Sequence, residues 1–224
     1  MDINFKPYFD KYEALVEKAE AAFDRVKAAH AECVKCEEKC ADCCFALFDL
    51  TLIEALYLHH KFNEKFKGST KVELVEKASH ADRRIYKIKR KAFKEFQSGR
   101  NEGELLAEMA LERVRCPVLS EEDLCELYEY RPLTCRFYGI PTAIGGAGHT
   151  CGKSGFKEGE QYPTVNLDAV HTQLQQISAE LLRDIESRNV KLVDLLVPLS
   201  SAMIMDFDEV FLGVAEEPAE KPQP

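Results

Sequence analysis

The sequence lacks the long apolar runs that would place the chain in a membrane. A membrane-spanning helix needs roughly 18 apolar residues in a row. The most apolar stretch, Leu192 to Met205, is interrupted by Asp194, Pro198 and two serines. The charged first residues, MDINFKPYFDKYE, contain no apolar segment of the kind that directs secretion. We therefore expect a cytoplasmic protein that does not associate with membranes.

Basic residues are also fewer than acidic ones. The 224-residue chain has 39 acidic and 30 basic residues, for a net charge of −9. A surface of that sign repels phosphate backbones, so nucleic acid is not an expected partner. The one strongly basic stretch, residues 83–91, has acidic residues on both sides. It predicts a solvated helix face, with a local docking patch as the alternative.

Motifs of common catalytic sites are missing as well. We find no Ser–His–Asp arrangement, no paired-carboxylate site and no phosphate-binding loop. The glycine-rich run Gly145–Gly148 follows no expected strand, so it fails as a nucleotide-binding fingerprint. Ordinary hydrolytic and nucleotide-dependent chemistries are therefore not indicated.

Apolar periodicity predicts a mostly α fold. Apolar residues and then cysteines recur every three or four positions from Tyr8 to Leu50, without glycine or proline, which predicts one long helix. Thr51 and Glu54 form a capping-box signal for the next helix, and Asn101 is a good helix cap. The further expected helices run from Thr51 to Gly68, about Thr70 to Phe96, Asn101 to about Val114, Val170 to Ile185, and about Lys191 to Met205.

Between Arg115 and Pro163 this periodicity disappears, and seven glycines and three prolines collect. An irregular stretch of that length is unusual in a compact domain unless function or a ligand orders it. The expected architecture is therefore a helical cluster with a long irregular cysteine- and glycine-rich metal-binding loop. One domain is expected over residues 1–214, followed by a disordered acidic and proline-rich tail over 215–224.

Nine cysteines carry the most informative chemistry. In a chain without an export signal, dense cysteines indicate metal binding or catalysis rather than disulfides. Two groups of four stand out: Cys36, Cys40, Cys43 and Cys44, and then Cys116, Cys125, Cys135 and Cys151. Four thiolates close a tetrahedral zinc site or hold a four-iron cluster. Eight could serve two sites, or some could hold one site and leave the others structural.

Simple packing is the alternative for these thiols, because free cysteine is a small and often buried hydrophobe. Five cysteines within twelve positions are too many for packing alone. For Cys33 both interpretations stay open, because removing it leaves a balanced set of eight. His149, two residues before Cys151, is an alternative ligand.

Both cysteine groups and their neighbours form a recognisable sequence pattern. Its residues are Cys36-Glu-Glu-Lys-Cys40-Ala-Asp-Cys43-Cys44, Cys116-Pro-Val-Leu, Cys125-Glu-Leu-Tyr128-Glu129-Tyr-Arg131-Pro132-Leu-Thr-Cys135-Arg136-Phe-Tyr138-Gly, and then Cys151. This pattern resembles the YkgJ-type cysteine-cluster family. The resemblance implies a zinc- or iron-chelating domain with these eight cysteines as its ligand set. A related domain occurs in flagellin lysine N-methylase.

The choice of metal follows from spacing. Compact structural zinc sites favour C-x2-C pairs, and only Cys33-x2-Cys36 and Cys40-x2-Cys43 have that spacing. With the resemblance, this favours an iron–sulfur cluster of the [4Fe-4S] kind in a redox or accessory protein that has a protein partner. The alternatives are a zinc-stapled helical adaptor and an enzyme of the flagellin lysine N-methylase type.

Two arginines, Arg131 and Arg136, lie among the cysteines of the second group. Their charge would offset the negative charge of a thiolate site with either metal. The alternative role is an ion pair with Glu126 or Glu129 that holds the loop.

Overall fold

The computed structural model describes residues 3–215, and the expected mostly α fold is confirmed there. The described helices are α1 (Lys6–Ala29), α2 (Leu52–Lys65), α3 (Gly68–Gln97), α4 (Glu102–Leu111), α5 (Leu133–Phe137), α6 (Leu167–Asp184) and α7 (Leu199–Ile204). Short 3-10 turns are η1 (Asp42–Phe45), η2 (Tyr128–Tyr130) and η3 (Val190–Asp194). The expected tail, residues 215–224, lies outside the described residues apart from Ala215.

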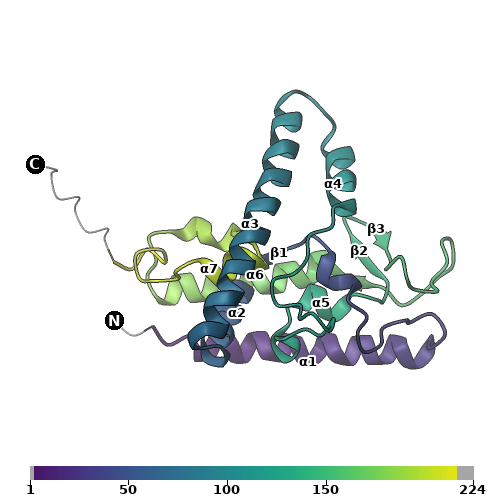
Figure 1. The fold of residues 1–224 in the computed structure, drawn as a ribbon, viewed down its shortest axis with the longest axis horizontal. Helices are drawn as coiled ribbons and strands as arrows, with labels where there is room; N and C mark the ends of the chain where they lie inside the picture. The colour runs from purple at the N-terminus through teal and green to yellow at the C-terminus, as the bar shows by residue number, and fades with distance from the viewer. Residues whose placement is uncertain (1–2, 216–224) are drawn as a thin grey trace, which may run out of the picture.

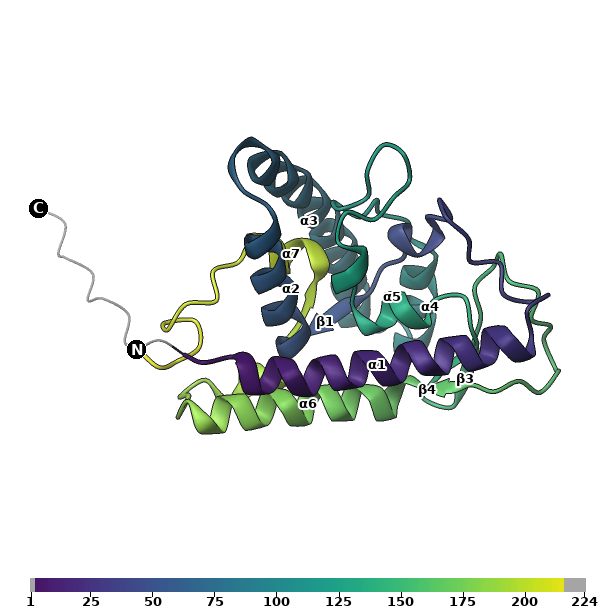
Figure 2. The ribbon, with the colours of Figure 1, turned by 90° about the horizontal axis from the view of Figure 1, so that it is seen from below.

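Helices α1 and α6 lie side by side along the length of the molecule (Figure 2). The apolar face of α1 supplies Tyr12, Ala19 and Val26 to the main core, and α6 supplies Leu174, Ile177 and Leu181. Helices α2 and α5 also pack on α1. The apolar faces that these helices bury against one another are the main source of stability in such an arrangement.

A second core forms where α2, α3 and α7 meet, around Phe62, Leu74 and Met203. Beyond this core, α3 extends outward and α4 folds back beside it, which makes a protruding arm (Figure 1). Arg100, at the end of the arm, donates hydrogen bonds to the carboxylates of Glu95 and Glu108. The arm therefore carries its own ion pairs but contributes little to either core.

The strands are short: β1 (Asp49–Thr51), β2 (Thr142–Ile144), β3 (Ala147–His149), β4 (Val165–Asn166) and β5 (Leu196–Pro198). Strand β1 pairs antiparallel with β5, with Asp49 opposite Pro198. Strands β2 and β3 form a hairpin, and β2 also pairs in parallel with β4. These small sheets join segments that are distant in the sequence.

The helices with clear end signals are confirmed. The side chain of Thr51 and that of Glu54 form the expected capping box at the start of α2, and Asn101 caps α4 by accepting from the N–H of Glu104. Helix α3 spans the expected range, and α6 ends one residue before Ile185. Helix α4 ends at Leu111, earlier than expected.

The prediction of one helix from Tyr8 to Leu50 is wrong beyond Ala29. After Ala29 the chain leaves the helix, and the Cys33 carbonyl accepts a hydrogen bond from the N–H of Gly155 at 2.7 Å. Lys39 has a φ of 67°, which no α-helix contains. Long-range contacts therefore override the local helical period, and the first cysteine group lies on a loop and on η1 instead of along one helix face.

The predicted last helix from Lys191 to Met205 is also wrong. This stretch forms η3, strand β5 and the short helix α7. Pro198 lacks an N–H and stands at the position before α7, which is where proline ends one element and allows another to begin. The region between Arg115 and Pro163 is largely irregular, as expected, but α5 and the β2–β3 hairpin interrupt it.

Within residues 3–215, none of the helices combines the length and apolar character that crossing a membrane requires.

Candidate metal centre

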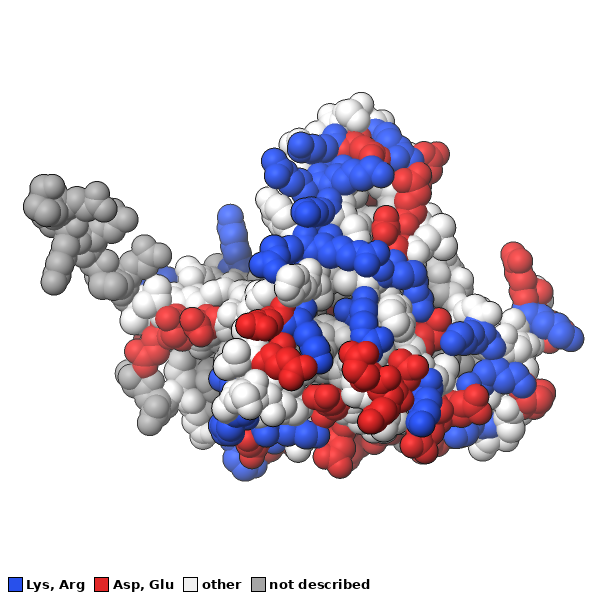
Figure 3. Space-filling model, viewed as in Figure 1, with Lys and Arg blue, Asp and Glu red and all other residues white. Residues whose placement is uncertain are grey.

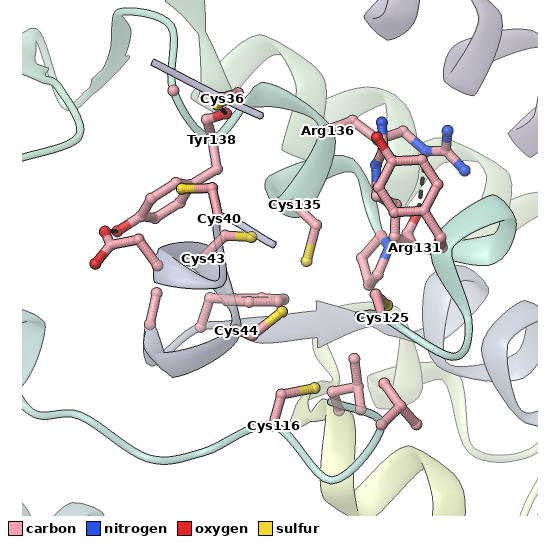
Figure 4. A pocket seen from close by; sticks show the side chains of 18 of the residues that line it. Cys36, Cys40, Cys43, Cys44, Cys116, Cys125, Arg131, Cys135, Arg136 and Tyr138 are labelled. Carbon is pink, nitrogen blue, oxygen red and sulfur yellow. Dashed lines mark hydrogen bonds between the residues drawn. The ribbon is translucent and has the colours of Figure 1, made fainter. Parts of the chain in front are cut away.

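Four parts of the chain bring thiols to one cavity of about 660 Å³. The loop after α1 supplies two cysteines, η1 supplies two, the segment between α4 and α5 with α5 itself supplies three, and the loop after β3 supplies one. The cysteines that line the cavity are Cys36, Cys40, Cys43, Cys44, Cys116, Cys125, Cys135 and Cys151. All eight residues predicted as ligands therefore line one cavity, and Figure 4 labels all of them except Cys151.

A short backbone ladder joins the two cysteine motifs. The N–H of Cys116 donates to the carbonyl of Cys44 at 2.7 Å, and the N–H of Val114 donates to Phe45. A further bridge in this ladder pairs Ala46 with Arg113. These bonds hold the η1 cysteines against the cysteines of the second motif, although some 70 residues separate them in the chain.

Helix α5 places Cys135. Its first N–H, on Leu133, donates to the buried Glu54 carboxylate at 3.1 Å, and the same carboxylate accepts from the N–H and hydroxyl of Thr51. Burial raises the pKa of Glu54, and the hydrogen bonds oppose that rise. One buried carboxylate thus fixes both the start of α2 and the start of the helix that carries Cys135.

Cys36 has a close neighbour in Gly139. A Cβ atom at Gly139 would lie 2.2 Å from the Cys36 sulfur, and Gly139 has a φ of 102°. Only glycine satisfies both conditions without strain. The Cys36 thiol also donates to the carbonyl of Tyr138 at 3.5 Å.

Burial opposes the ionisation of several of these thiols when no metal is bound. Burial raises the pKa of Cys36 to about 11 and that of Cys116 to about 12, and it raises the pKa of Cys135 as well. Cys43 is the exception, because its hydrogen bond with Cys44 lowers its pKa, with a smaller effect from the Arg131 guanidinium. Binding a cation here would displace protons, which is usual for thiolate sites.

Arg131 provides the clearest sign that the cavity suits an anionic group. Its guanidinium stacks on the ring of Tyr128 at 3.8 Å from the centroid. Its Nε and Nη1 atoms are buried and have no hydrogen-bond partner among the described residues. A buried unpartnered donor costs about 1–3 kcal/mol. A thiolate-bound metal, which carries negative charge on sulfur, fits this donor set.

Arg136 has a different place. It is buried and donates to the carbonyls of Arg131 and Glu129 and to the carboxylate of Glu20 on α1. Its side chain thus ties the segment around η2 to α1. The expected ion pair of an arginine with Glu126 or Glu129 is not formed by either arginine within the described residues.

At the opposite edge of the cavity lies a polar network that sequence reasoning missed. The carboxylate of Asp42 accepts hydrogen bonds from Arg113 at 2.8 Å and from the Tyr138 hydroxyl at 2.8 Å. The Cys151 thiol lies 3.6 Å from the same carboxylate. The position of Asp42 between Cys40 and Cys43 was the only sequence signal for its role.

The other two candidate ligands lie elsewhere. Cys33 is buried in the main core beside Val34 and Phe156 and does not line the cavity. His149 is exposed on β3 and does not line it either. As placed within residues 3–215, no three Cys, His, Asp or Glu side chains form a group that could hold a single ion. The thiols surround a shared space.

Comparison with known protein families agrees with the chemistry of this cavity. A family model with the signature CxxCxxCC, described as a zinc- or iron-chelating domain, matches residues 35–152, just over half of the chain. The chain therefore belongs to this family of metal-chelating domains. Comparison with curated proteins gave no match, and comparison with solved structures gave none.

Proposed function

We propose that this chain holds an iron–sulfur cluster of the [4Fe-4S] kind through its cavity cysteines and acts as a redox or accessory protein. The observation that carries the proposal is the set of eight thiols around one cavity that also contains the unpartnered donors of Arg131. Cysteine thiolates are the usual ligands of such clusters. When bound, the cluster would supply one-electron transfer.

Two features favour iron–sulfur over zinc. A tetrahedral zinc site with bonds of about 2.3 Å holds its four sulfurs about 3.8 Å apart. The thiols here surround a cavity of about 660 Å³, which suits a larger polynuclear group. In addition, donors such as the Arg131 N–H groups suit the sulfide and thiolate sulfurs of a cluster, whose potential depends on such hydrogen bonds.

The deciding experiment is anaerobic purification followed by measurement of iron, acid-labile sulfide and zinc per chain, with the visible spectrum. We expect at least about four irons and four sulfides per chain and broad absorption in the visible. Cys33→Ser is the matched control, because Cys33 lies outside the cavity, and it should keep the metal. Stoichiometric zinc in colourless protein would replace this proposal with the zinc-stapled helical adaptor.

We also propose that the protein is cytoplasmic. All nine cysteines are free in the structure. Thiols in this number persist in a reducing compartment, whereas oxidising compartments convert them to disulfides.

A redox or accessory role also needs a partner, and we propose a protein that docks on the arm. Arg83, Lys87, Arg90 and Lys94 recur on one face of α3, are exposed and form no ion pair with described residues. Figure 3 shows basic side chains gathered over this arm. Tyr86 and Phe93, also exposed, provide apolar contact area beside the charge. Ala81 and Ile85, lower on the same helix, line the cavity.

A small acidic redox protein is a suitable probe of this surface. We expect it to reduce the metal-loaded protein at a rate that falls with salt. The double variant Arg90→Glu and Lys94→Glu should react about tenfold more slowly, because opposite charges accelerate encounter. The control is the double variant Lys18→Glu and Arg25→Glu on α1, where both side chains are exposed and neither lines the cavity, and it should react at the unchanged rate. Equal rates in all three proteins would remove the arm from the proposal.

A further inference from the structure

We infer that the eight cavity cysteines form two metal sites, and that each site draws ligands from both sequence motifs. The inner site consists of Cys44, Cys116, Cys125 and Cys135. The outer site consists of Cys36, Cys40, Cys43 and Cys151. The inference rests on the proposed role of these thiols as ligands, but not on which metal they hold. Compared with the two groups seen in the sequence, two cysteines change places: Cys44 joins the cysteines of the second motif, and Cys151 joins those of the first.

The inner site is assembled by bonds across the two motifs. The backbone bond from Cys116 to Cys44 joins the two motifs, and within the second motif the Leu119–Cys125 bridge and the bond from the Leu119 N–H to the Cys116 carbonyl bring Cys125 towards Cys116. The fourth thiol, on Cys135, lines the same cavity and interacts electrostatically with Cys43, at the boundary of the two sites, and then with Cys116 and Cys125. Figure 4 shows Cys44, Cys116, Cys125 and Cys135 around a common space beside Arg131, with Cys43 at its edge.

Buried residues flank the inner thiols. Pro117 and Val118 follow Cys116, Leu127 follows Cys125, and Arg136 and Phe137 follow Cys135, all of them buried. The unpartnered donors of Arg131 belong to this side of the cavity, since Arg131 acts electrostatically on Cys125 and Cys135. A site in this place would be closed to solvent on most sides.

The outer site gathers the remaining four thiols. The Cys36 thiol donates to the carbonyl of Tyr138, the Tyr138 hydroxyl donates to the Asp42 carboxylate, and the Cys151 thiol contacts the same carboxylate, so Cys36 and Cys151 meet at one polar network. Among the thiols, those of Cys40, Cys151 and Cys43 act most strongly on Cys36. Cys43 contacts Cys44 and acts electrostatically on the other inner thiols as well as on Cys36, so it lies where the two sites adjoin. We assign it to the outer site because the inner site already has four thiols, and the outer site has only three without it.

The surroundings of the outer site are more exposed to solvent than those of the inner site. Residues 37–39 and 152–153, which flank its thiols, are exposed. Asp42 holds Tyr138 and Arg113 and lies against Cys151, which also accepts a hydrogen bond from the N–H of Lys153. A metal in this site would therefore be the one that solvent and chelators reach first.

Counting metal in three proteins tests the division. Wild-type protein should carry about eight irons per chain if both sites hold four-iron clusters, or two zinc ions if both hold zinc. The outer variant Cys36→Ser with Cys151→Ser and the inner variant Cys116→Ser with Cys135→Ser should each keep about half of that content. Circular dichroism would establish that each variant is folded, and Cys33→Ser would serve as the control with full content.

A second measurement uses wild-type protein alone, so it does not depend on the variants folding. Loss of metal to a chelator should proceed in two steps of equal size, the first of them fast. One step, or a wild-type content of only four irons or one zinc, would overturn the division and leave the proposed function standing with a single site. Protein that binds no metal would overturn both the division and the proposed function.

Discussion

Arg131 and Arg136 show how one residue type takes two roles beside the same cavity. Arg136 is fully engaged by backbone carbonyls and Glu20, so it stabilises the fold. Arg131 stacks on Tyr128 and leaves two buried donors without a partner among the described residues. Arg136, whose donors the protein already engages, is therefore structural, whereas Arg131 keeps donors that suit a bound anion.

Replacing Arg131 should change the electronic properties of the bound metal. In Arg131→Met the apolar stem remains but the positive charge is lost. Positive charge favours the reduced, more negative state, so the reduction potential should fall by about 60 mV, or about 1.4 kcal/mol for one electron. A redox titration would measure this. The control Tyr128→Phe keeps the stacked ring and should leave the potential within about 15 mV of wild type. A wild-type potential in Arg131→Met would contradict the role given to the guanidinium.

Gly139 should be intolerant of any side chain. Gly139→Ala puts a Cβ against the Cys36 sulfur and forces a positive φ on alanine. We expect a stability loss of about 1–3 kcal/mol and loss of the metal held by Cys36, measured by thermal unfolding and metal content. Gly148→Ala is the matched control, since open space surrounds Gly148. Full metal content in Gly139→Ala would show that Cys36 is not a ligand.

Among the elements, α2 and α5 are coupled through a single side chain. Glu54 is the capping-box residue of α2, and it also accepts the first N–H of α5. The cap was predictable from the spacing of Thr51 and Glu54. The bond to Leu133 was not, because it joins residues whose proximity only the packed fold creates.

Removing this carboxylate should therefore affect both helices. Glu54→Ala leaves buried donors on Thr51 and Leu133 without a partner, so we expect it to destabilise the protein by about 2–4 kcal/mol. It should also reduce metal content, because α5 carries Cys135. Urea unfolding and metal analysis would measure both effects. Asn101→Ala removes the cap of α4, on the arm, and should cost only about 1 kcal/mol with no loss of metal; a similar metal loss in both variants would argue against the coupling.

For the whole molecule, the notable division is between cores made by helices and a cysteine-rich region with little regular structure. The two apolar cores involve α1, α2, α3, α6 and α7, and α5 adds Leu133 and Phe137 to the main core. The region from 112 to 163 surrounds the cavity and contributes fewer buried residues to these cores than the rest of the chain does. Because few elements order it, metal binding should supply part of its stability.

Metal removal should then loosen this region selectively. After anaerobic chelation we expect a lower melting temperature and faster amide hydrogen exchange between residues 112 and 163, while α1 and α6 keep their protection. Limited proteolysis should cut first in the same region. Uniform loss of protection along the chain would mean that metal supports the entire fold, and unchanged exchange would mean that the region is ordered without it.

Local sequence was enough for α2, through its cap, and for α3 and α6, through their apolar periods, because these signals act within a few residues. It was also enough to single out eight cysteines, all of which line one cavity. Pro198 marks the split of the last expected helix in the sequence itself, whereas the end of α1 and the separation of Cys33 from the cavity followed from packing. These depend on contacts such as Cys116 with Cys44, Gly155 with Cys33 and Gly139 with Cys36. Their partners are far apart in the chain, so only the folded arrangement decides which of them meet.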